Sequence, residues 1–145
     1  MDPRTAAKAL RQLIDGEDFP PPRQVLSRIP IASAAKVPNG AKFSLLTYVE
    51  HANFWHRVWL GRLRGERAPN ITQDWRVPEA SEWPAVRDEF LAGLEEAHRL
   101  ASAQPFAHAM RSDEKAVKTL LQIAIHDTYH VGQFVILKRL ARNGD

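Results

Sequence analysis

The chain has 145 residues, of which 20 are Lys or Arg and 17 are Asp or Glu, giving a net charge of +3 with neutral histidines. It contains no cysteine, which excludes disulfides, thiolate nucleophiles and cysteine-ligated metal sites. The small basic excess is better explained by solvated helix surface than by a phosphate-binding patch, so nucleic acid is disfavoured as a partner. The N-terminus lacks a signal-peptide pattern, and no apolar run reaches the length of a membrane-spanning helix. We therefore expect a cytoplasmic protein without a membrane partner.

The spacing of apolar residues predicts four long helices. The first covers 3–14, because Asp-Pro at its start supplies a cap and a proline at the first helical position, and Gly16 follows its end. Three consecutive prolines then block regular structure, and a short helical turn is expected over 23–30. The second helix covers 41–64, where apolar side chains recur every three or four residues, and Gly65 ends it.

A long loop with two prolines is expected over 66–82, between the second and third long helices. The third helix follows Ser81 as its N-cap, and the fourth follows Ser112 and continues to a stop at Gly144. No alternating strand pattern is present in the sequence. It therefore predicts a single all-α domain over 1–145, folded as an antiparallel four-helix bundle.

Two histidines four residues apart lie on the inward face of the fourth helix. At about 100° per residue, His130 is about 40° from His126 and Gln133 is about 20° away on the other side. Two ring nitrogens at this spacing reach a single divalent ion. His51 shares a face of the second helix with apolar and aromatic residues, which makes it the best third ligand. Asp127 is rotated by about 100°, to the edge of the inward stripe.

The other histidines have different interpretations. His56 is about 140° from His51 around the helix and is expected to pack against the core or to lie at its rim. His108 is expected in a solvated loop. Glu95 and His98 have the E-x-x-H spacing of di-iron bundle proteins, but the sequence contains no second such pair, so a di-iron centre is disfavoured.

Further candidates share the helix faces of the three histidines. Three polar residues are candidates for orienting the imidazoles by hydrogen bonds, with solvated or core positions as the alternative: Glu50, Asp127 and Gln133. Three aromatic residues are candidates for lining a substrate pocket, although core packing is the commoner role of helical aromatics: Tyr48, Trp55 and Tyr129.

Two stretches of the sequence are similar to the motifs of a known family. HDTYHVGQ in the fourth helix and the Glu-His pair of YVEHANFW in the second resemble the DinB-like (damage-inducible) superfamily of metal-binding four-helix bundles, and the likeness covers most of the chain. The Trp- and Pro-bearing loop QDWRVPEASEW also fits, whereas Asp127 stands where Asn is usual. The resemblance implies that His51, His126 and His130 bind a divalent ion, commonly zinc or nickel, and that two copies form a homodimer.

The chemistry of such a site leaves two functions open. Three neutral imidazoles leave an ion with a free position, where the pKa of a water or a thiol falls. The first function is a metal-dependent transferase or hydrolase that directs a low-molecular-weight thiol or water at an electrophilic small molecule. The second is a non-catalytic, stress-related metal-binding bundle in which the ion is structural or sensory. The lack of a fourth ligand in helical phase favours catalysis.

Overall fold

The computed structural model describes residues 1–143, and all regular elements in that range are helical, as the sequence predicted. Four long helices make up most of it: α1 (Pro3–Asp15), α4 (Leu45–Arg64), α5 (Trp83–Ser102) and α6 (Asp113–Asn143). Four short elements lie in the connections: α2 (Pro22–Val25), α3 (Ile31–Ala35) and the 3-10 turns η1 (Ile71–Gln73) and η2 (Ala80–Glu82). The stop predicted at Gly144 lies outside the described residues.

The ends of α1 and the start of α6 follow the sequence signals. The Asp2 carboxylate accepts a hydrogen bond from the N–H of Arg4 at 2.9 Å, and Gly16 closes α1 with a left-handed φ of 68°. At the start of α6, the Ser112 hydroxyl accepts the N–H of Lys115 at 3.2 Å. These caps satisfy backbone groups that have no partner inside the helix.

Two of the long helices begin later than the sequence predicted. The cap of α4 is Ser44, whose Oγ accepts the N–H of Thr47 at 3.1 Å. α5 begins only after η2, because the N–H of Glu79 donates to the Glu82 carboxylate at 2.7 Å and so stabilises a separate turn. Ser81 therefore lies inside η2 and does not cap the long helix.

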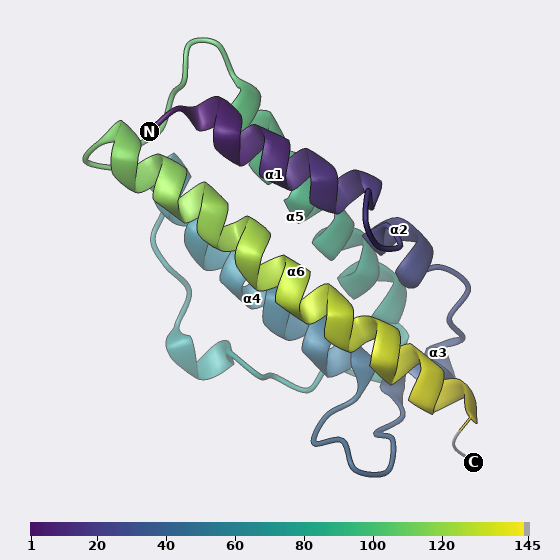
Figure 1. Ribbon diagram of the computed structural model, residues 1–145. Helices are drawn as coiled ribbons and strands as arrows, with labels where there is room; N and C mark the ends of the chain where they lie inside the picture. Colours follow the sequence, from purple (N-terminus) through teal and green to yellow (C-terminus); the bar gives the residue numbers. More distant parts are fainter. Residues whose placement is uncertain (144–145) are drawn as a thin grey trace.

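The four long helices pack side by side around a shared interior. α1 contacts α5 and α6, and α4 contacts the same two helices. α1 and α6 run in one direction, whereas α4 and α5 run in the other (Figure 1). Since α4 is covered on two sides, it buries most of its length. No helix within residues 1–143 has the length and apolarity needed to cross a membrane.

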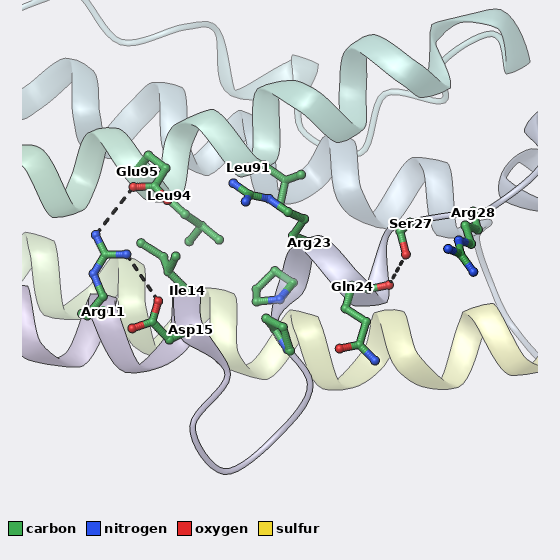
Figure 2. A pocket seen from close by; sticks show the side chains of 12 residues that line it. Arg11, Ile14, Asp15, Arg23, Gln24, Ser27, Arg28, Leu91, Leu94 and Glu95 are labelled. Atoms are coloured by element: carbon green, nitrogen blue, oxygen red, sulfur yellow. Dashed lines mark hydrogen bonds and ion pairs between the residues drawn. The ribbon is translucent and has the colours of Figure 1, made fainter.

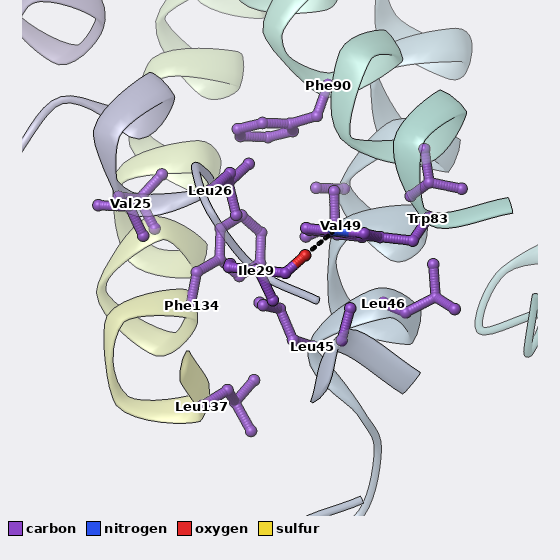
Figure 3. Packing of buried hydrophobic residues seen from close by; sticks show 14 of the residues in the cluster. Val25, Leu26, Ile29, Leu45, Leu46, Val49, Trp83, Phe90, Phe134 and Leu137 are labelled. Carbon is purple, nitrogen blue, oxygen red and sulfur yellow. Dashed lines mark hydrogen bonds between the residues drawn. The ribbon is translucent and has the colours of Figure 1, made fainter. Parts of the chain in front are cut away.

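Buried apolar side chains form two clusters, one toward each end of the long helices. Figure 3 shows the first, in which Phe90, Phe134 and Leu137 pack near Trp83, whose indole N–H donates to the carbonyl of Ile29 at 3.2 Å. The second cluster contains the apolar residues of the later part of α4 and of the first turns of α6.

Polar side chains occupy the level where the two clusters meet. On α6 the second cluster takes its members from 116–124 and the first from 131–137, so 125–130 falls between them. On α4 the change from one cluster to the other comes between Ala52 and Phe54. The histidines that the sequence singled out lie at this level, enclosed by apolar packing above and below.

Candidate metal centre

Three imidazoles from two helices converge between α4 and α6. One ring nitrogen from each of His51, His126 and His130 lies within 4.8 Å of the other two. The two Nε2 atoms of His126 and His130 are 3.0 Å apart, and the His51 ring centroid is 4.8 Å from that of His130. The structure therefore brings together the three histidines that helix phase had selected.

Hydrogen bonds on the far side of two of these rings fix which nitrogen carries the proton. Nδ1 of His51 lies 2.6 Å from Oδ1 of Asp74, and Nδ1 of His130 lies 2.6 Å from Oε1 of Gln133. A carboxylate or amide oxygen only accepts, so each Nδ1 is the donor and the proton is inferred to sit there. Each Nε2 is then left with a bare lone pair that faces the centre of the cluster.

The third ring, His126, faces Asp127. Its Nδ1 lies 3.5 Å from Oδ1 of Asp127, and these two buried atoms have no other hydrogen-bond partner within residues 1–143. Asp127 is fully buried, whereas the sequence placed it at the edge of the inward stripe. Its other oxygen, Oδ2, lies 2.5 Å from Nε2 of His56. The carboxylate thus stands between two imidazoles on different helices.

His56 is a core residue and not a rim residue. Its side chain is only 4% exposed, and its ring stacks on Phe90 with centroids 5.2 Å apart and planes 13° from parallel. Gly93 on α5 makes room for it, because a Cβ at that position would come within 2.2 Å of Nδ1 of His56. The sequence analysis placed His56 toward the edge of the apolar surface because it assumed a single inward face on this helix. In the structure α4 packs against both α5 and α6, so it has more than one buried face.

Burial favours the neutral form of two rings of the cluster, those of His51 and His130. It lowers the pKa of His130 to about 4, although the hydrogen bond with Gln133 opposes the shift. Burial also lowers the pKa of His51, against the hydrogen bond and charge of Asp74. For Asp127, burial raises the pKa, but the charge of His56 and the hydrogen bonds with the two histidines outweigh it, so the net shift is downward. At pH 7 the chain therefore presents neutral His51 and His130 rings near an ionised Asp127 carboxylate.

This donor set fits a divalent cation of the imidazole-binding kind. The bare Nε2 of His130 lies 3.0 Å from Nε2 of His126, a separation that a proton or a cation between the two nitrogens accounts for. Zinc and nickel both bind neutral imidazole as a ligand. In such sites the other ring N–H usually donates a hydrogen bond to an oxygen atom, as His51 and His130 do here. In the part of the chain that the structure describes, the ligand cluster consists of three residues, and a cavity borders it.

The loop between α4 and α5 supplies two neighbours of His51 that the sequence analysis did not select. Asp74 accepts from Nδ1 of His51 and, through Oδ2, from the indole N–H of Trp55 at 3.0 Å. Trp75 lies flat on the His51 ring, with centroids 3.7 Å apart and planes 11° from parallel. Its φ of 63° is unusual for a non-glycine residue. The motif QDWRVPE was the available signal, but loops have no periodicity that would place its side chains.

Glu50 has a different role from the one expected of it. Its buried carboxylate accepts from Arg57 at 3.1 Å and from Arg76 at 3.0 Å, and Arg76 belongs to the same loop as Asp74. Glu50 therefore fastens the loop to α4, and Asp74 supplies the hydrogen bond to His51. Gln133, by contrast, contacts an imidazole as the sequence predicted.

Tyr48 belongs to the packing around Trp75. Its ring lies 5.2 Å from the Trp75 ring and 5.9 Å from that of Phe43, with edge-to-face geometry in both cases. It supports the loop from behind, in keeping with the core alternative that the sequence favoured.

The remaining histidines lie away from the cluster. His108 is not a solvated loop residue: its side chain is only 9% exposed, and its Nε2 lies 2.7 Å from Oδ1 of Asp113, at the start of α6. His98 is partly buried, with Nδ1 3.0 Å from the guanidinium of Arg11. Neither His98 nor Glu95 takes part in the cluster of three histidines found within residues 1–143.

A cavity of about 1040 Å³ is lined by two of the three histidines, His51 and His126. Trp55 and Tyr129, two of the expected pocket residues, line it, and Tyr129 is 66% exposed at its mouth. His51, His126 and Asp74 contribute the polar part of the wall. The rest of the lining comes from residues that the sequence analysis did not select: Trp59, Lys118, Leu121, Gln122 and Ile125.

A second groove, of about 760 Å³, lies between α1, α2 and α5 (Figure 2). The guanidinium of Arg11, at one end of the groove, lies 3.4 Å from the carboxylate of Asp15 and 3.7 Å from that of Glu95. Since both acids are paired, this groove offers no set of converging ligand atoms. The cavity beside the histidines is therefore the candidate functional site.

Fold and site together define an all-helical protein with a cluster of three histidines beside a large cavity. The family model of the DinB superfamily matches residues 23–134, a range that contains the three histidines and the loop with Asp74. The chain belongs to the DinB superfamily. Comparison with curated proteins and with solved structures found no match.

Proposed function

We propose that the chain is a metal-dependent enzyme of the DinB superfamily, built as an antiparallel four-helix bundle. His51, His126 and His130 would hold a divalent ion, zinc or nickel, between α4 and α6. The observation that carries the proposal is the convergence of these three ring nitrogens beside a cavity of about 1040 Å³. Three protein ligands leave a tetrahedral ion with a free position, which is typical of catalytic and not of structural sites.

The residues around the cluster would orient and shield the reacting groups. A bound divalent ion supplies Lewis acidity, which lowers the pKa of a thiol or a water so that either attacks at neutral pH. Asp74 and Gln133 hold two of the rings in the orientation that points Nε2 at the centre. The apolar wall of the cavity would exclude bulk water and hold an electrophilic small molecule near the nucleophile. The reaction class is transfer of a low-molecular-weight thiol, or hydrolysis.

A non-catalytic role is the second candidate. The cluster lies where the two apolar clusters meet and joins α4 to α6, so an ion there would also tie the two helices together. In that case chelation would lower the melting temperature strongly, since a ligand that binds only the folded state stabilises it by mass action. Assays with several thiols and electrophiles would then show no turnover by the metal-loaded protein.

Metal analysis of protein purified without an affinity tag tests the proposal. Near-stoichiometric divalent metal is expected in the wild type, with most of it lost in His126→Ala. His98→Ala is the matched control, because His98 lies outside the cluster and should leave the metal content unchanged. Equal metal content in the wild type and in His126→Ala would refute the assignment of the metal site. Metal binding followed by turnover that depends on a thiol or water would separate the enzyme from the non-catalytic candidate.

A further inference from the structure

The cavity beside the histidines extends along α6 toward the start of that helix. Lys118, Gln122 and His126 all line it and follow one another at intervals of four residues. This spacing places them on one face of the helix over roughly 12 Å of its length. The cavity thus has a ligand end, at His126, and a distal end, at Lys118.

Apart from Gln122, the wall between these two ends is apolar and aromatic. Trp55 and Trp59 on α4 lie 5.2 Å apart between ring centroids, and Leu121 and Ile125 line the cavity from α6. The hydrogen bond from Trp55 to Asp74 holds that indole in place. Fixed aromatic side chains of this kind favour a flat or extended apolar molecule.

The distal end carries a positive charge. Lys118 is exposed and makes no ion pair with any acidic group in residues 1–143. The acid that lines the same cavity, Asp74, is occupied by His51 and Trp55. An ammonium group at the end of an apolar channel attracts an anionic group of a ligand.

Building on the proposed function, we infer that the molecule bound here is elongated and has three parts. Its reacting group lies at the histidines, its middle is aromatic or extended apolar and packs on Trp55 and Trp59, and a carboxylate-like anionic group lies at Lys118. The substrate class is therefore an amphiphilic organic acid of roughly two helical turns in length, with its reactive atom at the end opposite the acid.

A matched pair of probes tests this inference on the zinc-loaded protein. One probe carries a mercaptomethyl group and a propanoate at opposite ends of a benzene ring, and the other is its primary amide. Quenching of tryptophan fluorescence, checked by calorimetry, gives the dissociation constants. The acid should bind about threefold to fivefold more tightly than the amide, the size expected of one partly exposed ion pair, and the preference should shrink at high salt.

Variants of Lys118 test whether this residue causes the preference for the acid probe over the amide. Lys118→Gln should abolish it and Lys118→Glu should reverse it, whereas the control Lys115→Gln, an exposed lysine outside the cavity lining, should keep it. Equal binding of acid and amide to the wild type, or a preference that survives in Lys118→Gln, would overturn the inference. A probe with a glycol spacer in place of the ring should bind roughly tenfold more weakly, since it buries less apolar surface.

A further pair of probes separates this inference from the metal site. In these the thiol is replaced by a methyl group, and they are measured on metal-free protein. If the metal-free protein still prefers the acid, and this preference depends on Lys118, the result supports binding of an anionic group at Lys118. That conclusion would stand even if the protein binds no metal and the proposed function fails. Loss of the preference in both arms, with normal metal content, would refute the inference alone.

Discussion

His56 and Asp127 form a buried pair that joins α4 to α6, with Nε2 of His56 2.5 Å from Oδ2 of Asp127 and side chains only 4% and 0% exposed. The second oxygen of the same carboxylate faces Nδ1 of His126 at 3.5 Å. A residue packed against Phe90 and Gly93 in the core is therefore connected, through one carboxylate, to a proposed metal ligand.

Removing either member of this pair should destabilise the protein strongly. Asp127→Ala leaves the His56 ring buried without its partner, and His56→Ala leaves a buried carboxylate, so each should cost about 3–5 kcal/mol of unfolding free energy. The double variant should cost clearly less than the sum of the two, because neither His56 nor Asp127 is then left buried without the other. Urea denaturation of the three variants measures this coupling. Additive losses would show that the pair contributes nothing as a unit.

Gly93→Ala should destabilise the protein, although alanine is the better helix former. A Cβ at this position would lie 2.2 Å from Nδ1 of His56, and overpacking of this kind costs about 1–3 kcal/mol. Gly132→Ala on α6 is the control, because no atom lies within 4 Å of its added Cβ. That variant should gain about 0.5–1 kcal/mol. Thermal melts of the two variants should therefore shift in opposite directions, and a shift in the same direction would contradict the close approach of His56.

Asp74→Asn should weaken metal binding without unfolding the protein. The amide keeps the size of the side chain but loses the charge that holds Nδ1 of His51. Substituting a residue that is hydrogen-bonded to a metal ligand commonly lowers the affinity for the metal tenfold to a hundredfold. Competition with a chromophoric chelator gives the dissociation constant. Asp88→Asn, at an exposed carboxylate paired with Arg87, should bind metal as the wild type does. Equal affinity in both variants would show that Asp74 does not act on His51.

The metal-free protein should lose stability as the pH falls from about 6.5 to about 4. The pKa of His130 is lowered to about 4, so in this window the unfolded state takes up a proton that the folded state does not. The contribution of His130 to this loss of unfolding free energy should reach roughly 3 kcal/mol, since one pKa unit corresponds to about 1.4 kcal/mol. Below about pH 4 its contribution should no longer change. His51, whose pKa is also lowered, adds in the same direction. Denaturation curves in the presence of a chelator, at several pH values, measure the slope.

The variant His130→Gln provides the comparison for that slope. It removes the titrating group, so its stability should fall less between pH 6.5 and pH 4 than that of the wild type. Parallel curves for the two proteins would show that His130 does not titrate with a lowered pKa.

Helix phase was enough to predict that His51, His126 and His130 converge, because the direction of a side chain around its helix is a local property. The spacing of His126 and His130, and the apolar face around His51, place the three rings inward whatever the exact packing of the helices. The same argument placed Asp127 at the edge of the inward stripe and left His56 open between a packing and a rim position, because it assumed one buried face for each helix. α4 contacts two other long helices and α6 contacts three, so positions about 100° or more from the main stripe are buried as well.

The loop residues were beyond the reach of such arguments. Asp74 and Trp75 lie more than twenty residues from His51 in sequence and follow no repeating pattern, so their contact with it depends on how the loop closes over α4. The sequence predicted the loop and its tryptophan, but not that an acid and an aromatic ring would enclose His51. The homodimer implied by the family resemblance stays a prediction.

The surroundings of His51 come from two kinds of structure, the long helices and the loop between α4 and α5. The three imidazole rings stand on long helices whose positions are set by the core, whereas Asp74 and Trp75 come from a connection that Arg76 ties down at Glu50. Insertions or substitutions in that connection would alter the reactivity and accessibility of the centre without repacking the helices. Divergence of specificity among proteins with this architecture should therefore accumulate in the segment between α4 and α5 sooner than at the histidines themselves.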